Sequence, residues 1–189
     1  MTIRRGWRPS TTRARSSTWS SPIWISSPCP TWTTSKATWP RQDVVWVSGG
    51  STANLLALWR LHGLDHTLRE AWQAGTVLMG VSAGSVCWHV GGTTDSFGLP
   101  LRPLTNALGF LPYSNSPHHD AEPGRRPLIH RLVGDGTLPA GYATDNGAGL
   151  VYLGTDLHEA ITEKPGALAY EIHREGDSAR ETPLPTRAL

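Results

Sequence analysis

Cysteine is scarce in this chain of 189 residues, which contains only Cys29 and Cys87. The two residues form neither a C-x-x-C pair nor a spacing typical of metal ligands. A disulfide-rich secreted domain and a cysteine-based metal site are therefore excluded. The simplest interpretation is a protein of a reducing, cytoplasmic compartment.

Long hydrophobic runs are also missing. No apolar stretch approaches the roughly 20 residues of a membrane-spanning helix. No apolar segment of about 7–15 residues, as an export signal requires, follows the early arginines. We therefore expect a soluble protein that has no membrane partner and is not exported by a standard signal.

Acidic residues are absent from the first 42 positions, which hold seven Lys or Arg. From Asp43 onward there are ten basic and fifteen acidic residues, so the body of the chain is acidic although the whole chain is formally +2. A basic groove for nucleic acid is therefore not expected in the folded part.

Residues 1–40 differ in composition from the rest, with eight Ser, eight Thr and five Trp but no Leu, Val, Asp or Glu. No helical or strand period runs through them, and the prolines at 22, 28, 30 and 40 interrupt any regular element. We expect this segment to be disordered or not a native, selected sequence. Residues 41–175 then form one domain, followed by a polar, frayed tail over 176–189.

The first half of the body alternates strands and helices. Apolar runs over 44–47 and 76–81 predict buried strands, and 53–61 and 65–72 predict helices between them. A further helix is expected over 83–90. This alternation indicates an α/β fold with a parallel sheet covered on both faces. Farther along we expect a helix over 128–133, a strand-turn-strand unit over 141–153 and a closing strand over 167–172.

The run Gly80-Val81-Ser82-Ala83-Gly84 lies between a predicted strand and a predicted helix. This is the context of a nucleophile elbow, in which the serine stands at the carboxyl end of the strand. The N–H of Ala83, at the start of the helix, is a candidate oxyanion donor. Ser82 is therefore the candidate nucleophile of an acyl-transfer hydrolase.

A serine nucleophile needs a base and an orienting carboxylate. Among the eight histidines, His118 and His119 lie in a proline-fixed loop that can reach the top of the sheet. Asp145 follows a predicted strand and is the preferred carboxylate. Asp120 is too close to His118 in sequence and is assigned instead to a substrate amine, and Glu122 and Asp95 are further acidic candidates, Asp95 more simply a turn or cap residue.

The order Ser82, His118, Asp145 differs from the Ser, acid, His order of the α/β-hydrolases, which argues against a lipase or esterase. An amidotransferase that uses Cys87 is disfavoured, because Cys87 lies inside the predicted helix after the elbow and is better interpreted as a small buried hydrophobe.

These residues resemble the peptidase E family of serine peptidases, which includes aspartyl dipeptidase and cyanophycinase. The likeness covers about residues 41–173 and rests on five motifs in order: Gly49-Gly50-Ser51-Thr52, Gly80-Val81-Ser82-Ala83-Gly84-Ser85, Thr93-Thr94-Asp95-Ser96, Asn115-Ser116-Pro117-His118, and Ala143-Thr144-Asp145-Asn146-Gly147.

The resemblance implies a flavodoxin-like three-layer sandwich with a mainly parallel sheet, related to the class I glutamine amidotransferases. It implies Ser82 as nucleophile, His118 as base, Asp145 as third member, and Gly50 with Ala83 as oxyanion donors. Substrate recognition would fall to basic residues near the histidine loop, Arg125 or Arg126, with Asp120 and Glu122 close by. The family's βα portion before residue 41 is missing or replaced here, and Ser48 and Ser51 depart from its glycine-rich turn.

The function predicted from the sequence is a serine peptidase that cleaves small peptides through an acyl-enzyme, with N-terminal Asp-X dipeptides as one substrate class. It needs no metal or organic cofactor, and a homodimer is compatible with the sequence. The alternative is an inactive relic or binding module of the same fold, suggested by the atypical N-terminal segment and the altered glycine turn.

Overall fold

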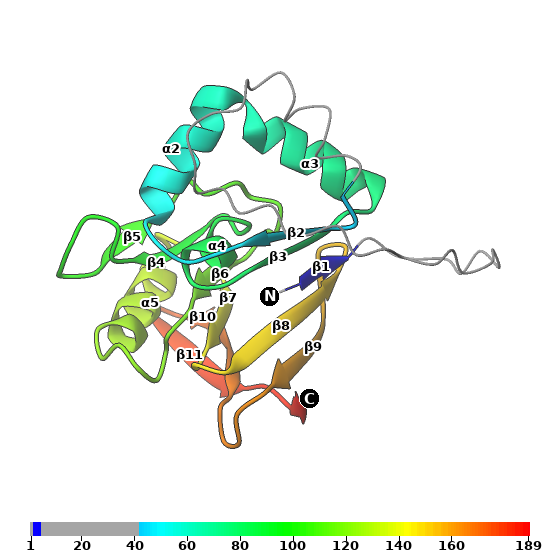
Figure 1. Cartoon of the computed structure of the whole chain (residues 1–189). Helices are drawn as coiled ribbons and strands as arrows, with labels where there is room; N and C mark the ends of the chain where they lie inside the picture. The colour runs from blue at the N-terminus through cyan, green and yellow to red at the C-terminus, as the bar shows by residue number, and fades with distance from the viewer. Residues whose placement is uncertain (1, 5–41) are drawn as a thin grey trace.

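The computed structural model describes residues 2–4 and 42–189, and these residues form a mixed α/β fold (Figure 1). The predictions for residues 5–41 lie outside the described part. The helices are α2 (Thr52–His62), α3 (Leu64–Ala74), α4 (Ala83–Val86) and α5 (Arg125–Gly134). The strands are β1 (Thr2–Arg4), β2 (Val44–Val47), β3 (Val77–Gly80), β4 (Gly91–Thr94), β5 (Arg102–Leu104), β6 (Ser114–Ser116), β7 (Gly141–Thr144), β8 (Ala148–Leu153), β9 (Asp156–Thr162), β10 (Ala169–Glu175), β11 (Ser178–Pro183) and β12 (Thr186–Ala188).

The unit from β2 to β3 follows the sequence pattern closely. The Ser51 hydroxyl caps α2 by accepting from the Asn54 N–H, and Gly63 ends the helix with a positive φ of 65°. Gly75 ends α3 in the same way, with φ 112°. These are the polar N-cap and the left-handed glycine that helix ends favour. Strands β2 and β3 then pair in parallel below the two helices (Figure 1).

The strands form two six-stranded sheets instead of one mainly parallel sheet. Their orders are β12-β9-β8-β1-β3-β2 and β11-β10-β7-β6-β4-β5. Pairing is parallel for β2–β3 and along β4–β6–β7, but antiparallel within β8–β9 and β10–β11. Two-residue turns beginning at Gly154 and Gly176 join these last pairs, and turns that short connect only antiparallel strands. The expectation of one mainly parallel sheet is therefore only partly met, because parallel and antiparallel pairs occur in both sheets.

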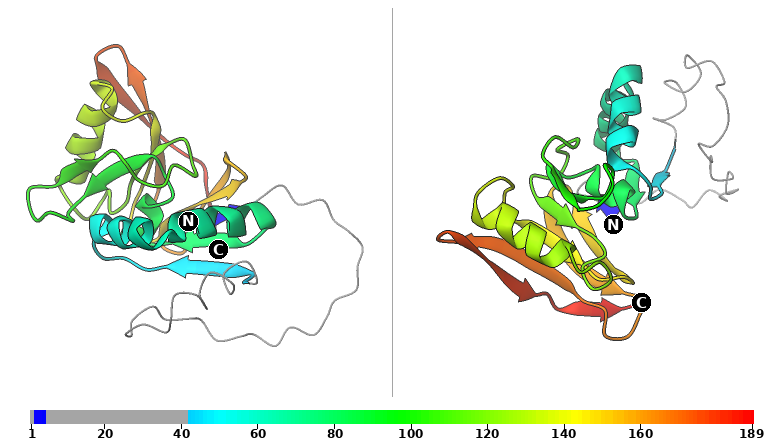
Figure 2. Two further views of the ribbon diagram at one scale, coloured as in Figure 1. Left: turned by 90° about the horizontal axis from the view of Figure 1, so that it is seen from above. Right: turned by 90° about the vertical axis from the view of Figure 1, so that its left-hand side faces the viewer.

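Two apolar clusters hold the fold together. The larger joins α2 and α3 to the first sheet and centres on rings, with Trp72 stacked on Phe110 at 5.6 Å and Trp88 tilted against the same ring. Helix α5 lies against the β10–β11 hairpin (Figure 2), and the smaller cluster includes Ile129 of α5 and Ile172 of β10. The helix α5 is thus fixed against the hairpin whose strand β10 pairs with β7, the strand that immediately precedes Asp145.

Two predicted boundaries need correction. The elbow helix α4 ends at Val86 instead of running to Val90, because the chain turns so that Gly91 can enter β4. The tail over 176–189, expected to be frayed, contains β11 and β12. It is held by pairing with β10 and β9, and main-chain pairing of this kind does not require apolar side chains.

In the described residues no helix is long and apolar enough to cross a membrane. Among the described strands β2 is the last of its sheet, and its Val44 and Trp46 side chains are exposed.

Candidate active site

Ser82 lies between β3 and α4 with φ 54° and ψ −118°, a conformation that a non-glycine residue rarely adopts. The flanking glycines make this turn sterically feasible. A Cβ at Gly80 would overlap the carbonyl oxygen of Gly84, and a Cβ at Gly84 would overlap that of Val47. Strain of this kind is retained at functional sites when the surrounding structure fixes it. The residue therefore has the backbone geometry of a presented nucleophile.

Ser82 opens onto a cavity of about 400 Å³. The cavity is bounded by the ends of β2 and β3, the loop after β6 and the β7–β8 turn with its hairpin. Its described lining consists of Trp46, Met79, Gly80, Val81, Ser82, Ser85, Asn115, Pro117, His118, Thr144, Asp145, Asn146, Gly147, Ala148, Gly149, Leu150, Ile161, Glu163 and Leu189. The elbow serine and the predicted base thus face one space.

His118 is the histidine of this lining, and like Ser82 it has a positive φ, 57°. Its Nδ1 lies 2.6 Å from Oδ1 of Asn146. The N–H of Asn146 in turn donates to Oδ1 of Asp120 at 2.8 Å. With Nδ1–H as donor, the Nε2 lone pair is left to accept a proton, which is the tautomer that a general base needs. The hydrogen bonds of the described residues do not include one between Ser82 and His118.

Asp145, predicted from the sequence to orient His118, is held elsewhere. Its Oδ2 accepts hydrogen bonds from the Leu168 N–H at 3.0 Å and the Tyr170 hydroxyl at 3.3 Å. Its Oδ1 is buried and has no hydrogen-bond partner among the described residues. The residue lines the cavity, but the contact to His118 comes from the next residue, Asn146.

The two predicted oxyanion donors lie near the elbow. Ala83 is the first residue of α4, so its N–H has no partner inside the helix. The glycine turn after β2 approaches the serine, since a Cβ on Gly49 would lie 3.4 Å from Cβ of Ser82. Gly50 follows with φ 133°, a value suited to glycine.

The predicted substrate-binding arginines do not line the cavity. Arg125 is buried and binds Glu122 at 2.9 Å and the Thr93 carbonyl oxygen at 2.6 Å. Arg126 pairs with Glu181 at 3.3 Å and lies over the ring of Tyr170. The first arginine thus ties α5 to β4, and the second ties α5 to β11.

Glu181 is shared by several cations and hydrogen-bond donors. Oε2 of Glu181 is 2.8 Å from Nε2 of His119 and 2.7 Å from Nε2 of His130. Burial alone would raise the pKa of Glu181, but the hydrogen bonds from the two histidines and the charge of Arg126 lower it overall. Burial lowers the pKa of His119. This cluster lies outside the cavity lining and joins the second sheet to α5.

The properties of His89 exclude it as the catalytic base. It is fully buried, and its Nδ1 donates to the Ser85 carbonyl oxygen at 2.9 Å. Burial lowers its pKa to about 3, so the ring stays neutral. Across residues 2–4 and 42–189, no group of three or more His, Cys, Asp or Glu side chains is arranged to hold a metal ion.

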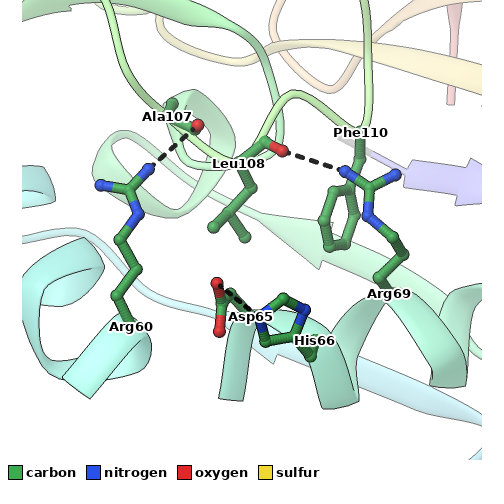
Figure 3. Close-up of a pocket in the computed structure, with 7 residues that line it drawn as sticks. All are labelled: Arg60, Asp65, His66, Arg69, Ala107, Leu108 and Phe110. Carbon is green, nitrogen blue, oxygen red and sulfur yellow. Dashed lines mark hydrogen bonds and ion pairs between the residues drawn. The ribbon is translucent and has the colours of Figure 1, made fainter. Parts of the chain in front are cut away.

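A second hollow, of about 150 Å³, lies between the α2–α3 pair and the loop over 106–110 (Figure 3). Arg60 donates to the Asn106 and Ala107 carbonyl oxygens, and Arg69 donates to Leu108 at 3.1 Å and covers Phe110 at 4.3 Å. Because both guanidinium groups already bind the loop, we assign them a structural role: they hold the loop against α2 and α3.

Sequence reasoning missed Asn146 and Glu163, which both line the cavity. Asn146 directly follows Asp145, and the sequence does not show which of the two side chains the turn directs toward His118. Glu163 comes after the β9 strand, in a segment without a motif, and its only sequence signal is an acidic charge near the hairpin.

Comparisons with known proteins identify the family of this chain. The model of peptidase family S51 matches residues 35–160. The chain is 46% identical to the uncharacterized peptidase YgaJ of Bacillus subtilis (strain 168) over 147 residues, which are 78% of this chain and 63% of the relative. It is 30% identical to peptidase E of Shewanella denitrificans over 145 residues, 70% of this chain and 60% of that protein.

The chain thus spans about three-fifths of the length of these curated relatives. A crystal structure of a candidate peptidase E protein from Listeria monocytogenes EGD-e matches 83% of this chain and 67% of its own, with 18% identity and a TM-score of 0.46. The extent of the family match and the identity to these relatives show that the chain belongs to peptidase family S51, the peptidase E family.

Proposed function

We propose that this chain is a serine peptidase that hydrolyses small peptides through an acyl-enzyme formed on Ser82. The single observation that carries the proposal is the strained Ser82, at φ 54°, facing the same cavity as His118. A structural serine in a βα turn has no need of this conformation. Membership of a peptidase family supports the same chemistry.

In the proposed acylation, Ser82 Oγ attacks the scissile carbonyl carbon while His118 Nε2 takes the hydroxyl proton. The C–N bond of the tetrahedral intermediate then breaks, and His118 returns the proton to the leaving amine. Water repeats the sequence on the acyl-enzyme and releases the acid. The N–H groups of Ala83 and Gly50 are the proposed oxyanion donors.

The orienting group is proposed to be Asn146, because its Oδ1 meets Nδ1 of His118 at 2.6 Å. A carboxamide fixes the tautomer, as the asparagine does in papain-like Cys-His-Asn sites. It provides no negative charge for the imidazolium, so we expect slower turnover than a carboxylate would give. For Asp145, the residue predicted from the sequence, to orient His118, the β7–β8 turn would have to rearrange.

The test is hydrolysis of a panel of dipeptides by the purified chain, measured as the release of new amino groups. We expect hydrolysis that is lost in Ser82→Ala and in His118→Ala but retained in the surface control Ser178→Ala. Equal hydrolysis by Ser82→Ala and the parent would overturn the assignment. Circular dichroism on each variant separates loss of chemistry from loss of fold.

The second candidate is an inactive binding module of the same fold. The carboxamide of Asn146 in the orienting position, together with the missing Ser82–His118 hydrogen bond, is the observation that favours it. A folded chain that binds dipeptides but hydrolyses none, even after Asn146→Asp, would establish this alternative.

Finer features of the sequence prediction belong to the same proposal. We propose that the parallel strands around the elbow represent the flavodoxin-like part of the fold, and that the enzyme acts in the cytoplasm. A homodimer remains a prediction, which sedimentation velocity on the purified chain tests. An Asp-X preference receives no support from Arg125 or Arg126, whose side chains are engaged away from the cavity.

A further inference from the structure

We propose that Asn146, which is followed by Gly147, is a site of spontaneous deamidation, and that its conversion to aspartate places a carboxylate on His118. The covalent modification is independent of the proposed function, whereas its effect on activity rests on that function. The covalent state of one turn residue would then set the rate of the enzyme.

The sequence distinguishes Asn146 from the other asparagines. The chain has four, at positions 54, 106, 115 and 146, and only the last is followed by glycine. An asparagine deamidates when the main-chain nitrogen of the next residue attacks its side-chain carbonyl carbon. A side chain on that next residue hinders the attack, and glycine has none. The other three asparagines precede Leu55, Ala107 and Ser116, so they serve as internal controls.

The structure presents this dipeptide at the surface. Asn146 and Gly147 form the turn between β7 and β8, which the Ala148 N–H closes by donating to the Asp145 carbonyl oxygen at 3.0 Å. Asn146 is exposed, and both turn residues line the cavity beside Ser82. Among the described residues, no hydrogen bond is donated by the Gly147 N–H. The attacking nitrogen therefore lies outside the hydrogen bonds that hold the hairpin.

The contact with His118 favours the same reaction. Oδ1 of Asn146 lies 2.6 Å from Nδ1 of His118. As the Gly147 nitrogen adds to Cγ, negative charge develops on Oδ1, and a donor that is already in place stabilises it. One further bond holds the residue, from its N–H to Oδ1 of Asp120 at 2.8 Å. Ring closure requires the turn to open locally, and exposed turns open at low free-energy cost.

The reaction consumes one water and releases one ammonia. In the first step a bond forms between the Gly147 nitrogen and Cγ of Asn146, and the Cγ–Nδ2 bond breaks. Nδ2 leaves as ammonia and takes up the proton that the Gly147 nitrogen loses. Water then opens the resulting succinimide ring. Attack at Cγ gives aspartate with the main chain restored, whereas attack at the main-chain carbonyl carbon gives isoaspartate, which adds a methylene group to the main chain.

The two products differ in their effect on His118. Aspartate keeps an oxygen that can meet Nδ1 and adds the negative charge that the carboxamide lacks. Charge-assisted hydrogen bonds are about twice as strong as neutral ones, so we expect kcat of the aspartyl form to be about tenfold higher at unchanged KM. Isoaspartate displaces the carboxylate and lengthens the turn, so we expect this form to be less active than the parent.

Ageing of the purified chain tests the modification. The folded chain is kept at mildly alkaline pH in water labelled with heavy oxygen, and peptide mass spectrometry follows each asparagine. We expect the label to enter position 146 about tenfold faster than the other three positions, because glycine leaves the attacking nitrogen unhindered. Asn54 and Asn106 are exposed like Asn146, so they isolate the effect of the following residue. A folded chain that keeps its amide at position 146 after a sample unfolded in guanidinium chloride has lost it would overturn the modification site.

Kinetics of the separated forms test the effect on activity. Anion exchange separates the converted chains from the parent by their added negative charge, and Asn146→Asp supplies the pure aspartyl form. Asn54→Asp adds the same charge at an exposed position of α2 outside the cavity lining, and its kcat should equal that of the parent. Asn146→Gln, whose longer side chain disfavours the five-membered ring, should gain no activity on ageing.

Failure of this inference and failure of the proposed function give different results. Hydrolysis that depends on Ser82 but is no faster in Asn146→Asp than in the parent would overturn the activating role. Conversion of Asn146 in a chain that hydrolyses nothing in either form supports the modification site and contradicts the peptidase.

Discussion

A close backbone contact at the elbow predicts that Gly84→Ala is strongly destabilising. A Cβ at Gly84 would overlap the carbonyl oxygen of Val47 and lie 2.7 Å from its carbon and 2.9 Å from the Ser48 carbonyl oxygen. All three atoms belong to the backbone of the neighbouring strand and turn, so no side chain can rotate away. The elbow and β2 must move apart instead.

Overpacking against movable side chains costs about 1–3 kcal/mol, and a rigid backbone neighbour places Gly84→Ala at about 3 kcal/mol or more. For a domain of this size each kcal/mol lowers Tm by about 2–4 °C, so we expect a fall of about 6–12 °C. The assay is thermal unfolding followed by circular dichroism at 222 nm.

Gly149→Ala is the matched control, because the nearest atom to its Cβ would be Cγ1 of Ile161 at an ordinary 3.4 Å. Its Tm should stay within about 2 °C of the parent, since most substitutions without steric conflict cost under about 0.5 kcal/mol. A Gly84→Ala chain with an unchanged Tm would refute the account of how the elbow packs.

Four other outcomes are expected. Asn146→Ala should lower kcat about 10- to 100-fold with little change in KM, because a hydrogen bond to the imidazolium contributes about 1.5–3 kcal/mol; a change confined to KM would contradict the orienting role. Arg125→Met should lower the free energy of unfolding by about 2 kcal/mol through loss of its bonds to Thr93 and Glu122, and a loss of affinity without a loss of stability would restore it as a substrate residue. The pKa values of His119 and Glu181 are lowered in the folded state, so as the pH falls these groups bind protons in the unfolded chain before they do so in the folded chain. Stability in urea should therefore fall as pH drops below about 6.5, and less so in His119→Asn. Arg69→Ala should cost about 1 kcal/mol, measured as a lower Tm with unchanged dipeptide hydrolysis.

The sequence predicts the elbow well because its motif is short and lies between a strand and a helix that can both be recognised. Gly80 is required by the carbonyl oxygen of Gly84 within the same turn, whereas Gly84 is required by the end of the neighbouring strand β2. His118 is predictable for a similar reason, since a proline fixes its loop at the end of a strand. The helices α2 and α3 follow from apolar spacing and from their capping residues.

The rest of the site depends on contacts between distant segments. Asp145 and Asn146 are neighbours in sequence. The Leu168 N–H and the Tyr170 hydroxyl hold the carboxylate of Asp145. It is therefore the Asn146 side chain that meets His118. Arg125 is charged and would be expected at the surface, yet the Thr93 carbonyl oxygen and Glu122 allow its burial. Neither outcome follows from composition or periodicity.

The measurement that tests the central claim most directly is covalent labelling of the purified chain with a fluorophosphonate, with the adduct located by peptide mass spectrometry. The account predicts a single adduct on Ser82, lost in Ser82→Ala and slowed in His118→Ala, while Ser178→Ala labels like the parent. A well-folded chain that takes no label, or carries it on another residue, would contradict the account.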